Sequence, residues 1–271
     1  MIESGIIREL LAAAPAFLLI AARALAMIET APLLSSESIP QAVKIALAGF
    51  TAYAVFPAAP VQDGNLDMFG VSFIFLVIGE AIIGIIIGFF LTIIFAAFST
   101  AGQFFSLQMG FGASETFDPL SQIENPLMGQ YLNLVAMLVF LSIGGFQELF
   151  VGGFFRSIQS ISVLSLARGR EAAAHMLLSG LSRLFLDAMV ISMPILGTLF
   201  LTSLSTGLIS KAAPQINILS EGFPISIMVA FILIYATLPF MVEAFSRVIA
   251  AGFASLENLY IQIAVPAGGP V

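Results

Sequence analysis

The chain has 271 residues, of which 59% are hydrophobic and only 9% charged, and its formal net charge is −7. Soluble domains carry about 25% charged residues, so this composition excludes a protein whose whole surface faces water. The absence of cysteine excludes disulfide frameworks and thiolate metal sites. The nine basic residues form no patch that could neutralise phosphates, so we expect no nucleic-acid partner.

The sequence predicts six apolar helical segments, each near or above the roughly 20 residues that cross a bilayer. In chain order they are 9–28, 41–59, 70–98, 127–146, 176–209 and 223–252. We therefore expect an all-α, polytopic protein of the integral membrane type, with one domain over 1–271. The first segment is not a cleavable signal peptide by its pattern, since no small-residue cleavage site precedes a polar region.

The predicted connections differ in kind. Residues 29–40 contain proline, serine and glutamate, residues 60–69 contain proline, aspartate and glycine, and both indicate plain turns. Longer connections are expected over 99–126 and 147–175. Residues 210–224 hold two prolines and a glycine, so a continuous helix is not expected there.

The basic residues disagree with simple alternating crossings. In that topology Lys44 and Lys211 would face the cytoplasm, whereas the richest basic cluster would lie on the opposite side: Arg156, Arg168, Arg170 and Arg183. Either the number of spans differs from six or the helices do not all cross the bilayer in the ordinary way. The apolar helices are expected to be surrounded by lipid, by other apolar subunits or by both.

The third segment combines small residues with a charge. Gly84 and Gly88 form a GxxxG pattern, which lets helices approach closely. Glu80 lies one turn earlier, and a carboxylate inside such a segment requires a polar partner or water. We favour structural pairing of Glu80 over a proton relay.

Charges also occur within the fifth and sixth segments. Asp187 ends a polar stripe with a spacing of four that also contains Glu171, His175 and Arg183. Glu243 and Arg247 are spaced to form an ion pair that would help to tie helices together. Catalysis by His175 is not expected, because no other histidine and no cysteine accompanies it.

The segment 106–121 is the most specific feature of the connections. Gly110 and Gly112 flank a phenylalanine and allow backbone conformations that other residues avoid. The segment either folds back into a protein cavity as a plug-like loop or is an ordinary exposed connection. Its candidate residues are Gln108, Met109, Gly110, Phe111, Gly112, Asp118 and Pro119.

No motif for nucleotide binding, metal-dependent hydrolysis or intramembrane proteolysis occurs in the chain. We therefore expect no enzyme activity, no cofactor and no metal site.

Several short motifs occur in one order along most of the chain. The early ones contain Arg23, Pro32, Pro40 and Lys44, followed by Gly79, Glu80, Gly84 and Gly88. The later ones are Gln108-Met109-Gly110 and Asp118-Pro119 of the plug-like loop, and then Pro214, Asn217, Gly222 and Pro224. With these motifs the chain resembles the FliR family of flagellar type III export-gate proteins, and more distantly its injectisome counterparts.

The resemblance implies a gate subunit that assembles with FliP and FliQ into a closed helical export channel and associates with FlhB. It implies an architecture of kinked helical hairpins, similar to a FliP and a FliQ joined in one chain. Exported flagellar proteins would be the cargo, and the location would be the bacterial inner membrane at the flagellar basal body. By the same resemblance, Gln108, Met109, Gly110, Asp118 and Pro119 belong to the plug, where Met109 and Phe111 seal the pore.

Two other functions stay open on the sequence. An injectisome homologue would keep the mechanism and change the cargo. A small secondary transporter would use kinked helices and intramembrane carboxylates for a substrate site, but the inverted repeat typical of many transporters is not visible in the sequence.

Overall fold

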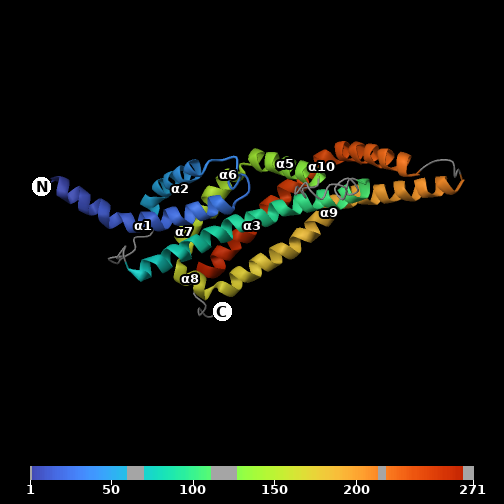
Figure 1. Cartoon of the computed structure of the whole chain (residues 1–271). Coiled ribbons are helices and arrows are strands. Elements are labelled where there is room, and N and C mark those ends of the chain that lie inside the picture. The colour runs from blue at the N-terminus through green and yellow to red at the C-terminus, as the bar shows by residue number, and fades with distance from the viewer. Residues whose placement is uncertain (1, 60–69, 111–126, 213–217, 265–271) are drawn as a thin grey trace. The chain divides into compact units, whose positions relative to one another are not determined.

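Helices form every regular element in the part of the chain that the structure describes. The computed structural model describes residues 2–59, 70–110, 127–212 and 218–264, and the side chains of 13–59, 70–110, 127–212 and 222–264. The elements (Figure 1) are α1 (Ile2–Thr30), α2 (Gln41–Val55), the 3-10 helix η1 (Phe56–Ala58), α3 (Val71–Met109), α5 (Leu127–Ser142), α6 (Gly145–Gln147), the π-helix η2 (Glu148–Phe155), α7 (Arg156–Ser160), α8 (Val163–Arg168), α9 (Arg170–Ala212) and α10 (Ile218–Ala264). The all-α prediction is confirmed for these residues.

Five of the described helical stretches are long and apolar enough to cross a membrane: Ala13–Thr30, Gln41–Ala58, Val71–Met109, Arg170–Ala212 and Gly222–Ala264. The stretches Leu127–Ser142 and Gly145–Ser160 are bent by 76° against each other and add a sixth if they count as one span. The prediction of a polytopic helical membrane protein is therefore confirmed.

The third apolar segment forms a longer helix than the sequence predicts. We predict a span over 70–98 and a loop over 106–121, but α3 continues to Met109. The buried face of the helix also continues, because Ala101, Phe105 and Met109 are spaced by four and completely buried. The start of the predicted loop is therefore the last turn of α3.

Two predicted connections contain more helix than expected. The connection over 147–175 holds η2, α7 and α8. In the region 210–224, α9 continues to Ala212 and α10 already begins at Ile218. Gly222 and Pro224 therefore lie within α10, where a proline removes only one backbone donor from a helix of 47 residues.

The packing of the chain separates two compact units. Unit 1 contains Met1–Thr92, Gly144–Ser179 and Ala251–Val271, and unit 2 contains Ile93–Ile143 and Gly180–Ala250. The helices α3, α9 and α10 each contribute residues to both units. This division does not test the single domain over 1–271, which stays a prediction.

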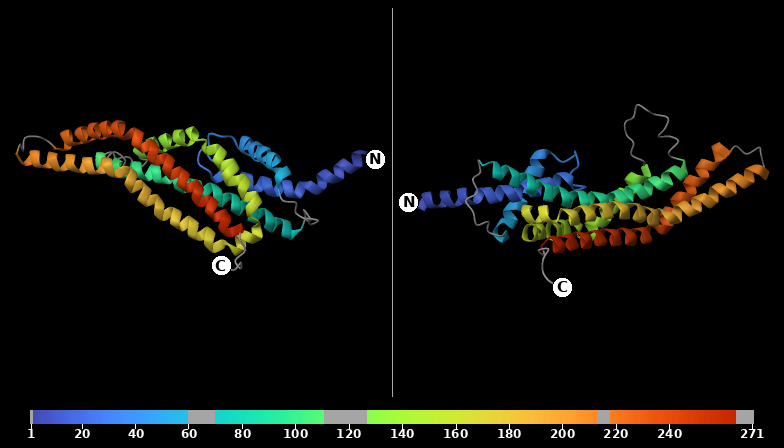
Figure 2. Two further views of the ribbon diagram at one scale, coloured as in Figure 1. Left: turned by 180° about the vertical axis from the view of Figure 1, so that it is seen from behind. Right: turned by 90° about the horizontal axis from the view of Figure 1, so that it is seen from below.

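Unit 1 is built on the hairpin of α1 and α2, which lie side by side in all three views (Figures 1 and 2). Its core is made of fully buried aliphatic side chains, among them Met27 and Ile28 of α1 and Ile83 and Ile87 of α3. The buried Tyr260 hydroxyl donates to the Gly153 carbonyl over 2.8 Å, so α10 is fixed to the π-helix η2.

Unit 2 has an aromatic core. The ring centroids of Phe98 and Phe245 lie 4.4 Å apart, and Phe95 contacts both Phe98, at 6.1 Å, and Phe140, at 5.5 Å. These rings come from α3, α5 and α10. The edge-on geometry of the Phe95 contacts is the arrangement that aromatic pairs prefer.

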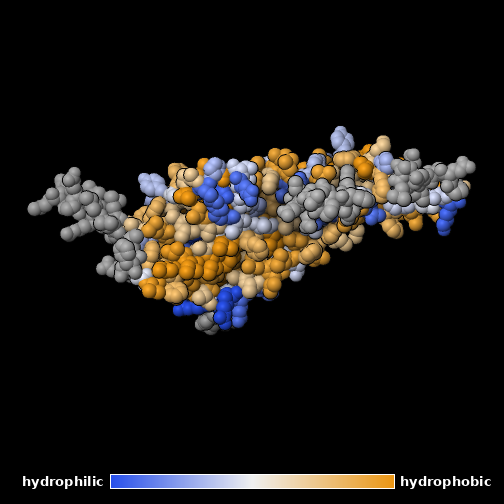
Figure 3. All heavy atoms as spheres, in the orientation of Figure 1, coloured by the Kyte–Doolittle hydropathy of each residue, from blue (hydrophilic) through white to orange (hydrophobic). Residues whose placement is uncertain are grey.

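Much of the apolar surface is not covered by the chain itself. The most apolar window of α3 is 61% buried, whereas those of α9 and α10 are 28% and 22% buried. Hydrophobic residues accordingly dominate the face shown in Figure 3. Large side chains such as Val190, Phe200 and Tyr235 are more than half exposed, so α9 and α10 present apolar faces to lipid or to other chains.

Candidate functional site

One face of α3 packs against α1. Its residues are spaced by four and therefore share a side of the helix: Glu80, Gly84, Gly88 and Thr92. A Cβ atom at Gly84 would overlap the backbone carbonyl of Arg23, and one at Gly88 would overlap the Thr30 side chain. Thr92 Oγ1 donates to the Thr30 carbonyl over 2.8 Å. The glycines thus bring the two backbones close enough for the polar ends of this face to bond.

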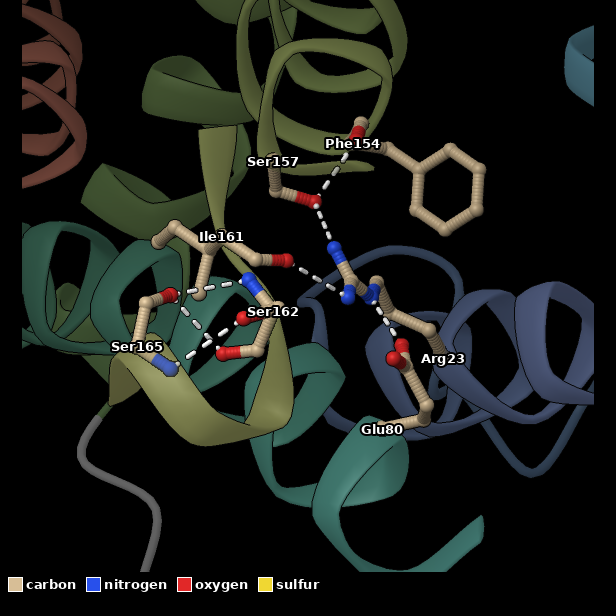
Figure 4. A network of polar contacts seen from close by, with 7 residues as sticks. All are labelled: Arg23, Glu80, Phe154, Ser157, Ile161, Ser162 and Ser165. Atoms are coloured by element: carbon tan, nitrogen blue, oxygen red, sulfur yellow. Dashed lines mark hydrogen bonds and ion pairs between the residues drawn. The ribbon is translucent and has the colours of Figure 1, made fainter. Parts of the chain in front are cut away.

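A buried ion pair lies at one end of this face (Figure 4). Arg23 of α1 is 3% exposed and Glu80 of α3 is 7% exposed. Arg23 Nε donates to Glu80 Oε2 over 2.5 Å. The structure therefore gives Glu80 a charged partner within its own chain.

The same guanidinium also binds the α7 region. Its Nη1 donates to Ser157 Oγ over 3.1 Å, and its Nη2 donates to the Ile161 carbonyl over 3.0 Å. The Ser157 hydroxyl in turn donates to the Phe154 carbonyl over 2.6 Å. All three nitrogens of the Arg23 guanidinium therefore have acceptors, as a buried charge requires.

The acceptor at Ile161 exists because the helix breaks there. Ile161 ends α7 in an extended conformation, with φ −121° and ψ 119°. Ser162 then begins α8 with a capping box, in which its hydroxyl accepts from the Ser165 backbone and the Ser165 hydroxyl accepts from the Ser162 backbone. The break turns the Ile161 carbonyl toward Arg23 (Figure 4).

This network holds α1, α3 and the break between α7 and α8 together. Its charges neutralise each other, and its hydroxyls bond to nearby carbonyl or backbone groups, so the arrangement offers no free acid, base or nucleophile. Among the described residues, no three His, Cys, Asp or Glu side chains lie close enough to hold a metal ion. The geometry favours a structural function for Glu80.

A second buried charge belongs to the connection between α1 and α2. Lys44 is 3% exposed, and its Nζ donates to Glu29 Oε2 and to the Ser35 carbonyl, both over 3.1 Å. Glu29 and Ser35 were not singled out from the sequence. Pro32 lies in the turn between Glu29 and Ser35, and Pro40 is the residue that precedes α2.

The plug-like loop is described only at its start. Gln108 and Met109 form the end of α3, and the Met109 side chain is completely buried. Four of the predicted plug residues lie outside the described residues: Phe111, Gly112, Asp118 and Pro119. The same holds for Pro214 and Asn217. The sealing function of Met109 and Phe111 stays a prediction.

Gly110 ends α3 with a conformation that favours glycine. Its φ is +91°, in the left-handed region. A Cβ atom here would overlap the ring of Phe223 in α10, a residue that no sequence pattern connected with Gly110. Two glycine properties are therefore used at one position, the positive φ and the absence of a side chain.

The remaining predicted charges form pairs along single helices. Arg183 and Asp187 on α9 are 3.7 Å apart, and so are Arg247 and Glu243 on α10. The side chains of Glu243 and Arg247 are 67% and 73% exposed. Within this chain the pair does not join two helices, so a function in tying helices together would require a partner chain and stays a prediction.

The fold places the chain among the polytopic α-helical membrane proteins. Its buried ion pairs join neighbouring helices. A family model described as bacterial export proteins, family 1, matches residues 14–252. The chain belongs to this family, that of the FliR proteins.

Individual relatives are similar over most of the chain. The flagellar biosynthetic protein FliR of Escherichia coli is 29% identical over 252 residues, covering 89% of this chain and 91% of the relative. FliR of Bacillus subtilis is 29% identical, covering 93% and 96%. FliR of Borreliella burgdorferi is 35% identical, covering 69% and 70%. The names of these relatives connect the family with flagellar biosynthesis.

Proposed function

We propose that this chain is a subunit of the flagellar type III protein export gate. In this proposal it forms, with FliP and FliQ, the channel through which flagellar proteins leave the cytoplasm, and FlhB associates with the assembly. The gate lies in the bacterial inner membrane at the flagellar basal body. The chain performs no chemistry and acts by opening and closing a path.

The family match carries this proposal. It extends from residue 14 to residue 252 and therefore overlaps every described helix. The relatives from Escherichia coli and Bacillus subtilis correspond to this chain over more than nine-tenths of their own length. A shared function is therefore proposed for the whole chain rather than for a fragment of it.

The exposed faces of α9 and α10 support the assembly with other subunits. Exposed apolar side chains recur along both helices, including Leu186, Val190 and Phe240. On α10 the charged residues Glu243 and Arg247 interrupt the apolar surface, and lipid would solvate them poorly. Polar groups on FliP or FliQ would accommodate this pair, so we propose these faces as the surfaces for the two partners.

Extraction in mild detergent tests the proposal. The tagged full chain is expressed from its own chromosome position, and the proteins purified with it are identified by mass spectrometry. FliP and FliQ are expected in the purified complex at constant ratios. Recovery of the chain alone, with transport of a small metabolite in liposomes, would overturn the proposal in favour of a transporter.

Gly110→Ala is expected to reduce export of flagellar substrates while the complex still assembles. The left-handed backbone costs a non-glycine residue about 1–2 kcal/mol, and the new methyl group overlaps Phe223, so the start of the loop must move. Secretion of a flagellar substrate into the medium and recovery of the complex are measured together.

Gly144→Ala is the matched control. Gly144 also has a positive φ, +74°, but the nearest atom to an added Cβ is 4.0 Å away. Secretion of the flagellar substrate by this variant is expected to stay close to that of the wild type. Equal secretion by both variants and the wild type would argue against a gating function for the end of α3.

A further inference from the structure

Unit 1 contains a pocket of about 420 Å³ beside the buried ion pair. This volume lies within the roughly 300–1,000 Å³ of ligand sites. Apolar side chains line most of it, from α1, α3, the α7–α8 region and α10: Leu19, Ile20, Leu76, Ile158, Val163 and Ile263. Arg23 and Glu80 also line it, but they are paired with each other.

The pocket opens toward the surface along α8. Leu164 lines the pocket and is 69% exposed. Exposed Gln159 and Ser162 lie in the same wall. An apolar ligand could therefore enter from the surface and keep a polar end outside.

Two arginines follow the pocket-lining residues of α8 in the sequence. Arg168 is one turn after Leu164 and so on the same face of α8. Gly169 follows it, and a Cβ atom at Gly169 would lie 2.8 Å from Ile263, which lines the pocket. Arg170 then begins α9, so the two arginines are the sequence neighbours of a glycine whose backbone lies close to Ile263.

Both arginines are exposed. In the part of the chain that the structure describes, neither Arg168 nor Arg170 has a side-chain hydrogen bond or an ion pair, whereas Arg156 in the same unit is paired with Glu257. The neighbouring Glu171 offsets one of the two charges. Hydrophilic residues gather at this end of unit 1, next to a hydrophobic surface (Figure 3).

We propose that this pocket binds an anionic phospholipid. One acyl chain fills the apolar pocket past Leu164, and the phosphate lies at Arg168 and Arg170. Basic residues between the helices of membrane proteins bind acidic lipid headgroups, and an apolar pocket can hold an acyl chain. Because the chain is a membrane protein, phospholipid is the amphiphile available at this opening. The negative charge of an anionic headgroup complements the two arginines.

Native mass spectrometry of the full chain tests the site. The purified protein is mixed with equal amounts of dioleoyl phosphatidylglycerol and dioleoyl phosphatidylcholine, which differ in headgroup charge and share their acyl chains. Retention of the anionic lipid is expected to exceed that of the neutral one by about tenfold. The isolated chain suffices, so the result is independent of the export-gate proposal.

Variants separate the two parts of the site. The double variant Arg168→Ala with Arg170→Ala is expected to retain both lipids equally, and retained neutral lipid shows that the pocket is intact. Ala16→Phe, which fills the pocket wall on α1, is expected to lower retention of both lipids. Arg247→Ala, an exposed arginine in unit 2, serves as the control and should keep the preference.

Equal retention of the two lipids by the wild type would overturn the proposal. So would a loss of preference in Arg247→Ala as large as in the double variant, because it would show a general effect of charge.

Discussion

Arg23→Ala is expected to destabilise unit 1 by about 3–5 kcal/mol, the usual effect of removing one partner from a buried ion pair. Glu80 would remain buried with its charge unpaired, and Ser157 and the Ile161 carbonyl would lose a donor. The expected result is a strong fall in the amount of protein in the membrane and in its thermal unfolding midpoint in detergent.

Two further variants distinguish the effect of the Arg23–Glu80 ion pair from the effect of losing side-chain volume. Arg23→Met combined with Glu80→Leu removes both charges and keeps similar volumes, so part of the lost stability should return. Arg156→Ala removes an arginine whose side chain is 50% exposed and paired with Glu257. Such an exposed pair contributes about 0–1 kcal/mol. An unfolding midpoint of Arg23→Ala equal to that of Arg156→Ala would contradict the structural function of the pair.

Gly84→Ala is the second change with a large expected effect. An added Cβ would overlap the Arg23 carbonyl and lie 3.0 Å from both the Ala26 Cβ and the Met27 backbone nitrogen. These neighbours are mostly backbone, so α1 and α3 must separate. Overpacking of this kind costs about 1–3 kcal/mol, and the separation also lengthens the Arg23–Glu80 contact. Thermal unfolding in detergent measures the loss.

Gly49→Ala is the matched control for this change. Gly49 also lies within a helix of unit 1, but no atom lies within 4 Å of an added Cβ. Alanine is favoured over glycine by about 1 kcal/mol within a helix, so this variant should be slightly more stable than the wild type. The two alanine substitutions are therefore expected to change the unfolding midpoint in opposite directions, and the same sign for both would contradict close packing at Gly84.

The sequence indicates one side of the candidate site well. Glu80, Gly84 and Gly88 share a helical spacing, and that spacing alone predicts a close-packed face with a charge at its end. The sequence did not indicate that Arg23 is the partner of Glu80. Arg23 is 57 residues away from Glu80, and Ser157 and Ile161 are 134 and 138 residues away from Arg23, distances at which local periodicity carries no information.

The helical character of the chain was predictable from its apolar segments, while the ends of the helices were not. Continued burial of Phe105 and Met109 extends α3 beyond its expected end, and burial depends on the tertiary partners. The contact between Gly110 and Phe223 was not predictable for the same reason, because it too depends on how α3 packs against α10. Glycine at a helix end predicts a positive φ, but nothing local indicates which ring would lie above it.

The order of synthesis gives the Arg23 network a further meaning. Arg23 of α1 and Glu80 of α3 are translated early, and they can neutralise each other well before Ser157 and Ile161 have been translated. Until these acceptors have been synthesised, Nη1 and Nη2 of Arg23 must donate to water or to polar groups at the lipid surface. The hydrogen bonds of Arg23 are therefore completed only by residues from the middle of the chain.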